Sequence, residues 1–150
     1  MAKKSPQSKQ IVNRRARFDY QVEDSFVVGI ALTGAETKAL RYGWGQLRGA
    51  YVTAKANELW LINATITGSG SIPISETDQT RARKLLAKRK EIDRLLAAKQ
   101  QGRTIIPLEL LTNGRYIKLR IALATGKKKY DKRETIKRRD QDREAHRAMR

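Results

Sequence analysis

The last 25 residues, 126–150, constrain the fold most, because this segment cannot build a hydrophobic core. It holds eleven Lys or Arg against five Asp or Glu, and its apolar residues beyond Tyr130 are only Ile136, Ala145, Ala148 and Met149. Burying so little apolar surface cannot offset an ordering entropy of about 1–2 kcal/mol per residue. The sequence therefore predicts a tail that is disordered when free and needs a partner to order it.

The charge distribution indicates what that partner is. The net charge is +18 over 150 residues, and residues 1–17 alone carry six basic side chains and no acidic one. Such an excess favours capture of phosphates, and Tyr130 among the cations of the tail favours RNA with exposed bases over a merely solvated basic surface. We expect a flexible basic arm at 1–12, a folded RNA-binding body at 13–125 and a basic tail at 126–150.

Composition also excludes several classes of function. The chain has no cysteine, so disulfides and thiol chemistry are excluded and we expect no metal site or cofactor. The one histidine, His146, lies in the tail, where packing cannot hold it as a general base, so we expect no enzyme. The longest apolar run, 26–32, is too short to span a bilayer, and Met1–Pro6 lacks an apolar signal segment, which predicts a cytoplasmic protein.

Periodicity predicts a mainly β fold with two helices. Alternating or continuous apolar residues, with turn residues at 55–57 and Asn113-Gly114, predict six strands at 18–23, 26–32, 48–54, 58–67, 104–111 and 116–123. Capping-box spacing between Thr33 and Glu36 begins a short helix that Gly43 ends, and 78–101 lacks Gly and Pro and predicts a long helix. A partly open six-stranded barrel of the oligonucleotide-binding (OB) type accommodates these elements, and a two-layer α+β sandwich is the alternative.

The predicted helix 78–101 carries a candidate phosphate-binding face. Residues 81–90 hold six basic side chains and no acid, so i,i+4 ion pairs within this stretch cannot neutralise them. Leu85 is expected in the core, whereas Leu86, turned by about 100° on a helix, is left open between core and surface. In the tail, the i,i+4 spacing of Glu134 and Arg138 favours a helix once phosphates neutralise the cations.

Five motifs in order resemble the bacterial SsrA-binding protein family, also called small protein B. They are NRRARFDY at 13–20, GIALTGAETKALR at 29–41, RARKLL at 81–86 with KEI at 90–92, PLEL at 107–110, and KLRIALATGKKKYDKR at 118–133. The resemblance spans residues 11–145. It implies an OB-type barrel that binds the tRNA-like domain of transfer-messenger RNA, and a monomer that acts with elongation factor Tu in delivering that RNA to stalled ribosomes.

By position, Asn13, Lys84 and Leu86 match family residues that face transfer-messenger RNA. The residues expected to contact that RNA are these three together with Arg14, Arg15, Glu36, Lys38, Arg41 and Arg83. Those expected to contact ribosomal RNA, in the empty messenger channel of the small subunit, are Gly126, Lys127, Lys128, Tyr130, Asp131, Lys132 and Arg133. The sequence departs from the family pattern at Val27, where the family usually has Glu, and at Gln79 and Ala87. A structural ribosomal protein with a small basic barrel is the alternative function.

Overall fold

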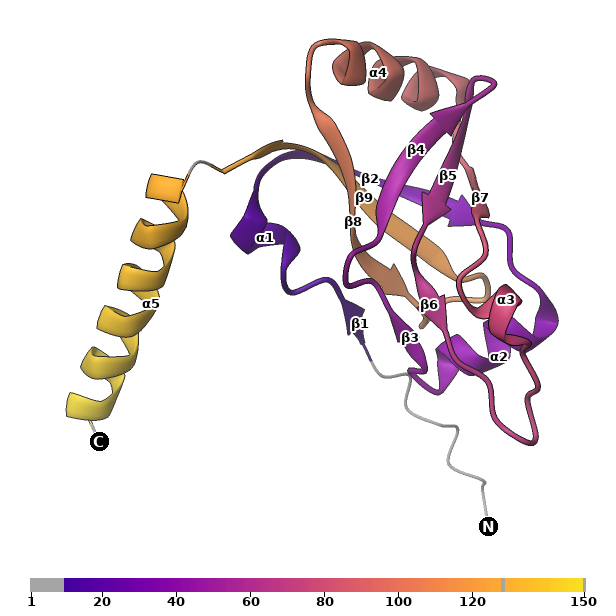
Figure 1. The fold of residues 1–150 in the computed structure, drawn as a ribbon, viewed down its shortest axis with the longest axis horizontal. Coiled ribbons are helices and arrows are strands. Elements are labelled where there is room, and N and C mark those ends of the chain that lie inside the picture. Colours follow the sequence, from indigo (N-terminus) through magenta and orange to yellow (C-terminus); the bar gives the residue numbers. More distant parts are fainter. Residues whose placement is uncertain (1–9, 128, 150) are drawn as a thin grey trace.

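The computed structural model describes residues 10–127 and 129–149, with the side chains of 129–131 outside the description. Its elements in chain order are β1 (Ile11–Val12), α1 (Ala16–Asp19), β2 (Tyr20–Ile30), α2 (Gly34–Arg41), β3 (Gly45–Gln46), β4 (Tyr51–Lys55), β5 (Glu58–Ile62), β6 (Thr65–Ile66), α3 (Glu76–Gln79), β7 (Arg83–Leu86), α4 (Arg89–Gln100), β8 (Thr104–Leu111), β9 (Lys118–Gly126) and α5 (Lys129–Ala148) (Figure 1).

Seven strands form one antiparallel sheet in the order β1-β8-β9-β2-β7-β5-β4, and β3 pairs with β6 in a small second sheet. β4 also lies against β8 without pairing to it, so the large sheet curls back toward its other edge and stays open there. The predicted mainly β fold with a partly open barrel is confirmed. The sheet has seven strands rather than six because 18–32, expected as two strands, contributes one, while β1 and β7 were not expected.

Local signals placed the short helix and both hairpins correctly. Thr33 caps α2 by accepting from the backbone N–H of Glu36 at 3.2 Å, and the Glu36 carboxylate accepts from the Thr33 N–H at 3.2 Å. Gly43 ends the helix with a φ of 83°, which favours glycine. β4 pairs with β5 through a turn in which Ala56 and Asn57 both have positive φ, and β8 pairs with β9.

The prediction of one long helix at 78–101 is wrong. This segment holds the short helix α3, the strand β7 and the helix α4, which begins only at Arg89. β7 is hydrogen-bonded to β2 on one side and to β5 on the other, through Leu85 opposite both Ile30 and Leu59. These partners are distant in the sequence, and pairing on both edges outweighs the helical preference of a segment without Gly or Pro.

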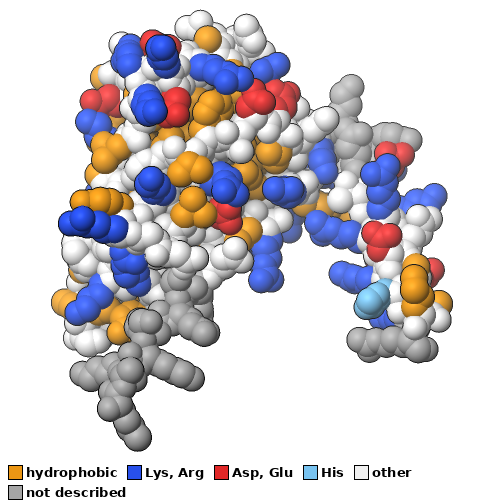
Figure 2. All heavy atoms as spheres, turned by 180° about the vertical axis from the view of Figure 1, so that it is seen from behind, with side chains coloured by type: hydrophobic (Ala, Val, Ile, Leu, Met, Phe, Trp, Pro, Cys, Tyr) orange, Lys and Arg blue, Asp and Glu red, His pale blue; other side chains and the backbone are white. Residues whose placement is uncertain are grey.

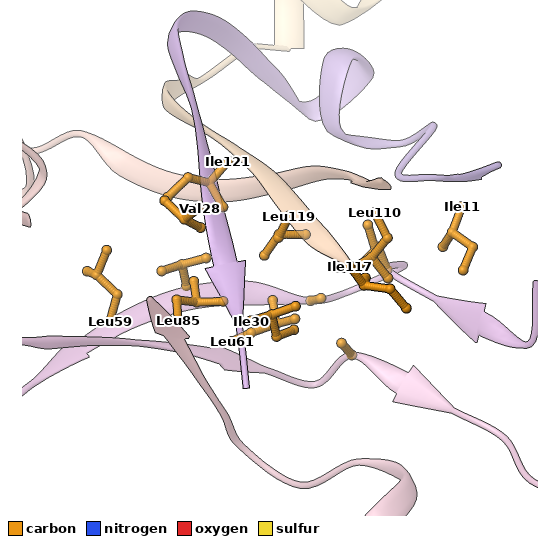
Figure 3. Packing of buried hydrophobic residues seen from close by; sticks show 14 of the residues in the cluster. Ile11, Val28, Ile30, Leu59, Leu61, Leu85, Leu110, Ile117, Leu119 and Ile121 are labelled. Carbon is orange, nitrogen blue, oxygen red and sulfur yellow. The ribbon is translucent and has the colours of Figure 1, made fainter. Parts of the chain in front are cut away.

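The core lies inside the curled sheet. Figure 3 shows Val28, Leu85, Leu119 and Ile121 from neighbouring strands pointing toward one another, and all four are at most 2% exposed. Leu95 of α4 is fully buried against the same cluster, so α4 packs on the body over the end of the sheet. This packing holds the outward-facing side chains of the strands on a rigid frame.

The folded body begins earlier than expected. The arm predicted for 1–12 lies partly outside the described residues, but Ile11 and Val12 pair with Leu110 and Glu109 of β8. Ile11 is 5% exposed and belongs to the core cluster. Phe18, expected to start a strand, lies in the helical turn α1 instead.

The tail is a helix that stands away from the body. α5 runs from Lys129 to Ala148 and lies beside α1 at the far end of β2 and β9 (Figure 1). The sequence predicts a tail that is disordered when free and helical on the ribosome, and the first half of that expectation stays a prediction. The absence of Pro and Gly after Gly126 and the helical spacing of opposite charges permit the helix, although it buries little apolar surface.

Candidate RNA interface

Strand β7 presents two of the expected RNA-binding side chains outward. Because side chains alternate along a strand, Lys84 and Leu86 face solvent while Arg83 and Leu85 face the interior. Leu86 is 54% exposed, and the Lys84 Nζ lies 3.0 Å from the carboxylate of Glu58 on β5. Leu86, which the sequence left open between core and surface, thus lies on the surface. The reason is the alternation of side chains along a strand, not the turn of about 100° between neighbours on a helix.

Arg83 is fully buried, which corrects its assignment to the RNA-binding set. Its guanidinium donates to the Glu36 carboxylate, and its Nη1 and Nη2 donate to the carbonyl oxygens of Ala64, Arg81, Asp78 and Gln79 at 2.9–3.1 Å. These five bonds use all five N–H groups of the side chain. Arg83 therefore ties β7 to α2, α3 and the β5–β6 connection, and no donor remains for a phosphate.

Glu36 is the acidic partner of this cluster and is likewise unavailable to RNA, at 1% exposed. It accepts hydrogen bonds from Arg81 and Arg83 and from the backbone of Thr33. Burial alone raises the pKa of the Glu36 carboxyl, but the hydrogen bonds from Arg81, Arg83 and Thr33 outweigh it and hold the pKa below its ordinary value. The carboxylate thus stays ionised, and its expected contact with RNA is corrected to a structural one.

Other predicted cations are also partnered. Arg41 donates to the carbonyl oxygens of Thr112, Gly114 and Arg115 at 2.9–3.1 Å, so it clamps the end of α2 to the β8–β9 turn rather than reaching outward. The basic stretch 81–90 contains no acid, but three of its cations form ion pairs with acids outside it. Arg81 pairs with Glu36, Lys84 with Glu58, and Arg89 with Asp93. Lys38 is exposed on α2.

Asn13, Arg14 and Arg15 lie together in the connection between β1 and α1. The Asn13 Nδ2 donates to the carbonyl of Pro107 at 2.9 Å, and its backbone N–H donates to Leu108 at 2.7 Å, so β8 fixes this connection. Arg14 and Arg15 are exposed, and Arg15 lies 3.5 Å from Asp19 as an i,i+4 pair. Two exposed guanidinium groups thus lie beside one anchored amide.

The register links this connection to β7 across the outer face of the sheet. Val12, Glu109, Arg120 and Val27 are consecutive cross-strand neighbours on β1, β8, β9 and β2. Two residues further along β2, on the same face, Gly29 lies between Lys118 of β9 and Leu86 of β7. We call this set, from Val12 to Leu86, together with Lys84 on the same side of β7, the outer face.

The outer face mixes cations with exposed apolar side chains. Val12, Val27 and Leu86 are 43–54% exposed, and Lys84, Lys118 and Arg120 lie among them. The Arg120 Nη1 donates to Glu109 at 2.6 Å. Val27, opposite Arg120, offers no hydrogen-bond acceptor where the family usually has Glu, and the acidic partner of Arg120 is Glu109 on β8. Figure 2 shows Lys and Arg side chains spread over the body and along α5, with hydrophobic side chains between them.

The other two departures are accommodated within the body. Gln79 donates to the Ile74 carbonyl at 3.3 Å and accepts from Arg83 through its own carbonyl. Ala87 is partly buried against the core.

The root of the tail is anchored on α1. Gly126 pairs with Tyr20 at the end of β9, and the Lys127 N–H donates to the Asp19 carbonyl at 3.0 Å. The Asp19 carboxylate lies 3.4 Å from the Lys132 Nζ, and the Phe18 ring carries cations from both elements at 5.5–5.9 Å. Those cations are Arg15, Lys132 and Arg139. Sequence reasoning missed the roles of Phe18 and Asp19, although an aromatic beside an acid within a basic run was visible.

The remaining tail residues are placed only in part. Arg133 is exposed on α5, and the Lys127 Nζ donates to the Thr135 hydroxyl at 3.2 Å. Lys128 lies outside the described residues, and for Tyr130 and Asp131 only the helical backbone is described.

The described part of the chain contains neither a metal-binding cluster nor a membrane-spanning helix. Among residues 10–127 and 129–149, no group of three or more His, Cys, Asp or Glu side chains could hold a metal ion. None of the helices within those ranges has the length and apolar character needed to cross a bilayer.

Comparison with known proteins identifies the family. The sequence matches the family described as SmpB protein over residues 10–150. The chain belongs to the SmpB family. Proteins named SsrA-binding protein from Maricaulis maris, Rhodopseudomonas palustris and Coxiella burnetii are similar to this SmpB-family chain, with 49%, 45% and 44% identity. The matches cover 97–100% of this chain and 95–98% of the relatives, so the resemblance predicted from the motifs is confirmed.

A solved structure is similar as well. A chain from the structure reported as "tmRNA-SmpB: a journey to the center of the bacterial ribosome" superposes with a TM-score of 0.66 at 36% identity. The match covers 85% of this SmpB-family chain and 94% of that chain.

Proposed function

We propose that this protein binds the tRNA-like domain of transfer-messenger RNA and delivers it to stalled ribosomes for trans-translation. The observation that carries the proposal is the family match over residues 10–150, together with relatives named SsrA-binding protein that align over nearly their whole length. The role requires binding and positioning, so no catalytic group is invoked.

The body captures transfer-messenger RNA through the outer face and the β1–α1 connection. Lys84, Arg14 and Arg15 are exposed cations that can neutralise phosphates, and each neutralised phosphate releases counterions. Leu86 and Val27 supply apolar contact beside them. Arg83, Glu36 and Arg41 support this surface from within, because they fix β7 and the end of α2.

The tail contacts the ribosome. Its helix carries cations on several sides and little apolar surface, which suits a channel lined with phosphates better than a protein groove. In this role Lys127, Lys128, Lys132 and Arg133 face ribosomal RNA in the empty messenger channel, and Tyr130 stacks on a base. The chain acts as a monomer, in a complex that also contains elongation factor Tu, within the cytoplasm.

Sequencing the RNA that co-purifies with the full chain tests the proposal. We expect one RNA species, transfer-messenger RNA, to dominate, with the protein substoichiometric to ribosomes and removed by high salt. A Lys84→Met variant should recover less of it, whereas Lys55→Met, a change of the same charge at the far end of β4, should not. If the protein instead stays on every ribosomal subunit through the salt wash, it is a structural ribosomal protein and the proposal is wrong.

The tail is tested separately. Replacing Tyr130, Lys132 and Arg133 by Ala should abolish tagging of stalled peptides while transfer-messenger RNA binding stays intact. Normal tagging by that variant would show that the tail is only an electrostatic tether.

A further inference from the structure

Two aromatic side chains form a stack at the end of α2 that the RNA contacts above do not use. The rings of Tyr42 and Trp44 lie with their centroids 5.0 Å apart and their planes inclined by 21°. Trp44 packs against the core cluster, whereas Tyr42 is 41% exposed. The stack therefore has an inner ring supported by the body and an outer ring that faces solvent.

The stack is rigidly held. The Trp44 N–H donates to the Ala39 carbonyl at 3.1 Å, and the Trp44 carbonyl accepts from the backbone and the hydroxyl of Thr67 at 2.9 and 3.2 Å. The Tyr42 N–H donates to Ala39 at 3.1 Å. Both backbones are fixed, and the Tyr42 ring rests on Trp44, which packs against the core, so a ligand that stacks on Tyr42 meets a surface that is already ordered.

A basic groove lies beside the stack. It has a volume of about 370 Å³ and is lined by Gly43 and Gly45, which flank Trp44, together with Arg14 and Arg48 among others. These two arginines are the only charged residues among the described residues that line it. Arg14 belongs to the β1–α1 connection already assigned to RNA, so the groove extends from that connection to the two glycines on either side of Trp44, although neither ring lines it.

More aromatic and basic groups lie at the same end of the molecule. Arg41 donates to the carbonyl of Arg115, which brings the β8–β9 turn to the end of α2. In that turn the Arg115 guanidinium lies 5.5 Å from the ring centroid of Tyr116, which is 69% exposed. Cations interleaved with exposed rings match a ligand that combines phosphates with flat bases.

We propose that the exposed face of Tyr42 is a stacking platform for one unpaired RNA base, with the adjoining phosphates in the Arg14–Arg48 groove. A base in a duplex has both faces covered, so the platform selects single-stranded or looped RNA over paired RNA. The inference rests on the proposed function only in taking RNA as the ligand. It adds a contact that reads an unpaired nucleotide beside the outer face.

Binding of two short RNAs to the full chain tests the platform. One probe is a single-stranded octanucleotide and the other is a blunt-ended RNA duplex without a loop, each measured by fluorescence anisotropy over a range of salt concentrations. Tyr42→Leu should weaken binding of the single strand about tenfold, equivalent to about 1.4 kcal/mol, and leave binding of the duplex unchanged. Since a stacking contact releases no counterions, the slope of log affinity against log salt should not change.

Two further variants make the result specific. Tyr42→Phe keeps the ring and should restore wild-type binding, while Tyr51→Leu removes a tyrosine of similar exposure, 44%, on β4 and should have no effect. Equal loss for both RNAs, or a changed salt slope, would overturn the platform in favour of a general electrostatic surface. If wild type and Tyr42→Leu bind the single strand equally well, or if wild type does not bind it at all, the platform is wrong. The proposed function is decided separately, by the RNA that co-purifies with the full chain.

Discussion

Adjacent residues of β7 should respond in opposite ways to the same substitution. Arg83 points inward and donates five hydrogen bonds, whereas its neighbour Lys84 points outward and pairs with Glu58. Replacing each by Met removes one positive charge and keeps an unbranched side chain. We expect Arg83→Met to destabilise the fold without changing how the folded protein meets RNA, and Lys84→Met to do the reverse.

The size of each effect follows from burial. Arg83→Met leaves the carboxylate of Glu36, 1% exposed, with one arginine fewer and takes a donor from four backbone carbonyls. Breaking a buried ion pair by removing one partner costs about 3–5 kcal/mol. The Lys84–Glu58 pair has both side chains more than 40% exposed, so its loss costs about 1 kcal/mol or less.

Urea unfolding and salt-dependent RNA binding measure the two effects. With a urea dependence of about 2 kcal/mol per molar for a chain of this size, Arg83→Met should lower the unfolding midpoint by roughly 2 M. Lys84→Met should leave the midpoint nearly unchanged but flatten the slope of log affinity against log salt by about 0.7–0.9, the loss of one phosphate contact. An Arg83→Met midpoint shift below about 0.5 M, or a flattened slope for that variant, would refute the division between a structural and an RNA-facing cation.

Three further outcomes are expected. Thr33→Ala should lower the free energy of unfolding by about 1 kcal/mol, because the α2 capping box loses one of its two bonds, and thermal unfolding would reveal it. Because the folded-state pKa of Glu36 lies below its ordinary value of 4.5, its stabilisation is present above that pH and is lost as pH falls through the folded pKa; Glu36→Gln should therefore lower stability near neutral pH and flatten the acid side of the stability profile. Phe18→Ala combined with Asp19→Asn should speed amide exchange in the first turns of α5 while the core amides exchange as before, and equal protection in both proteins would show that α1 does not anchor the tail.

Local sequence signals were sufficient for parts of the fold. The capping box at Thr33 and Glu36 and the turn at Asn113-Gly114 depend on residues within a few positions, and α2 and the β8–β9 hairpin lie where expected. The strand β7 could not be found in this way. Its four residues extend between partners on β2 and β5, and its inward arginine pairs with Glu36, 47 positions earlier in the chain.

The candidate site shows the same limit. Lys84 and Leu86 could be assigned outward roles from family motifs, but the same motifs include Arg83, and only its nonlocal acceptors show that it is buried. The Tyr42–Trp44 stack was also missed, because Gly43-Trp44-Gly45 indicates only that the chain leaves a helix. The sequence signal that could have predicted the stack was one aromatic residue on each side of Gly43.

The connection between β9 and α5 determines how far the end of the tail lies from the body. β9 ends at Gly126 and α5 begins at Lys129, and the Asp19 backbone accepts from Lys127 between them. If the tail were joined to the body by a flexible linker, the distance between them would vary. Once the body had bound one RNA, binding of the tail to a second RNA would then become less favourable as the linker became longer. Here a two-stranded ribbon continues into a helix of 20 residues, about 30 Å long. In the proposed role, the length of this helix would therefore set the distance between the RNA held by the barrel and the ribosomal RNA at the far end of the tail.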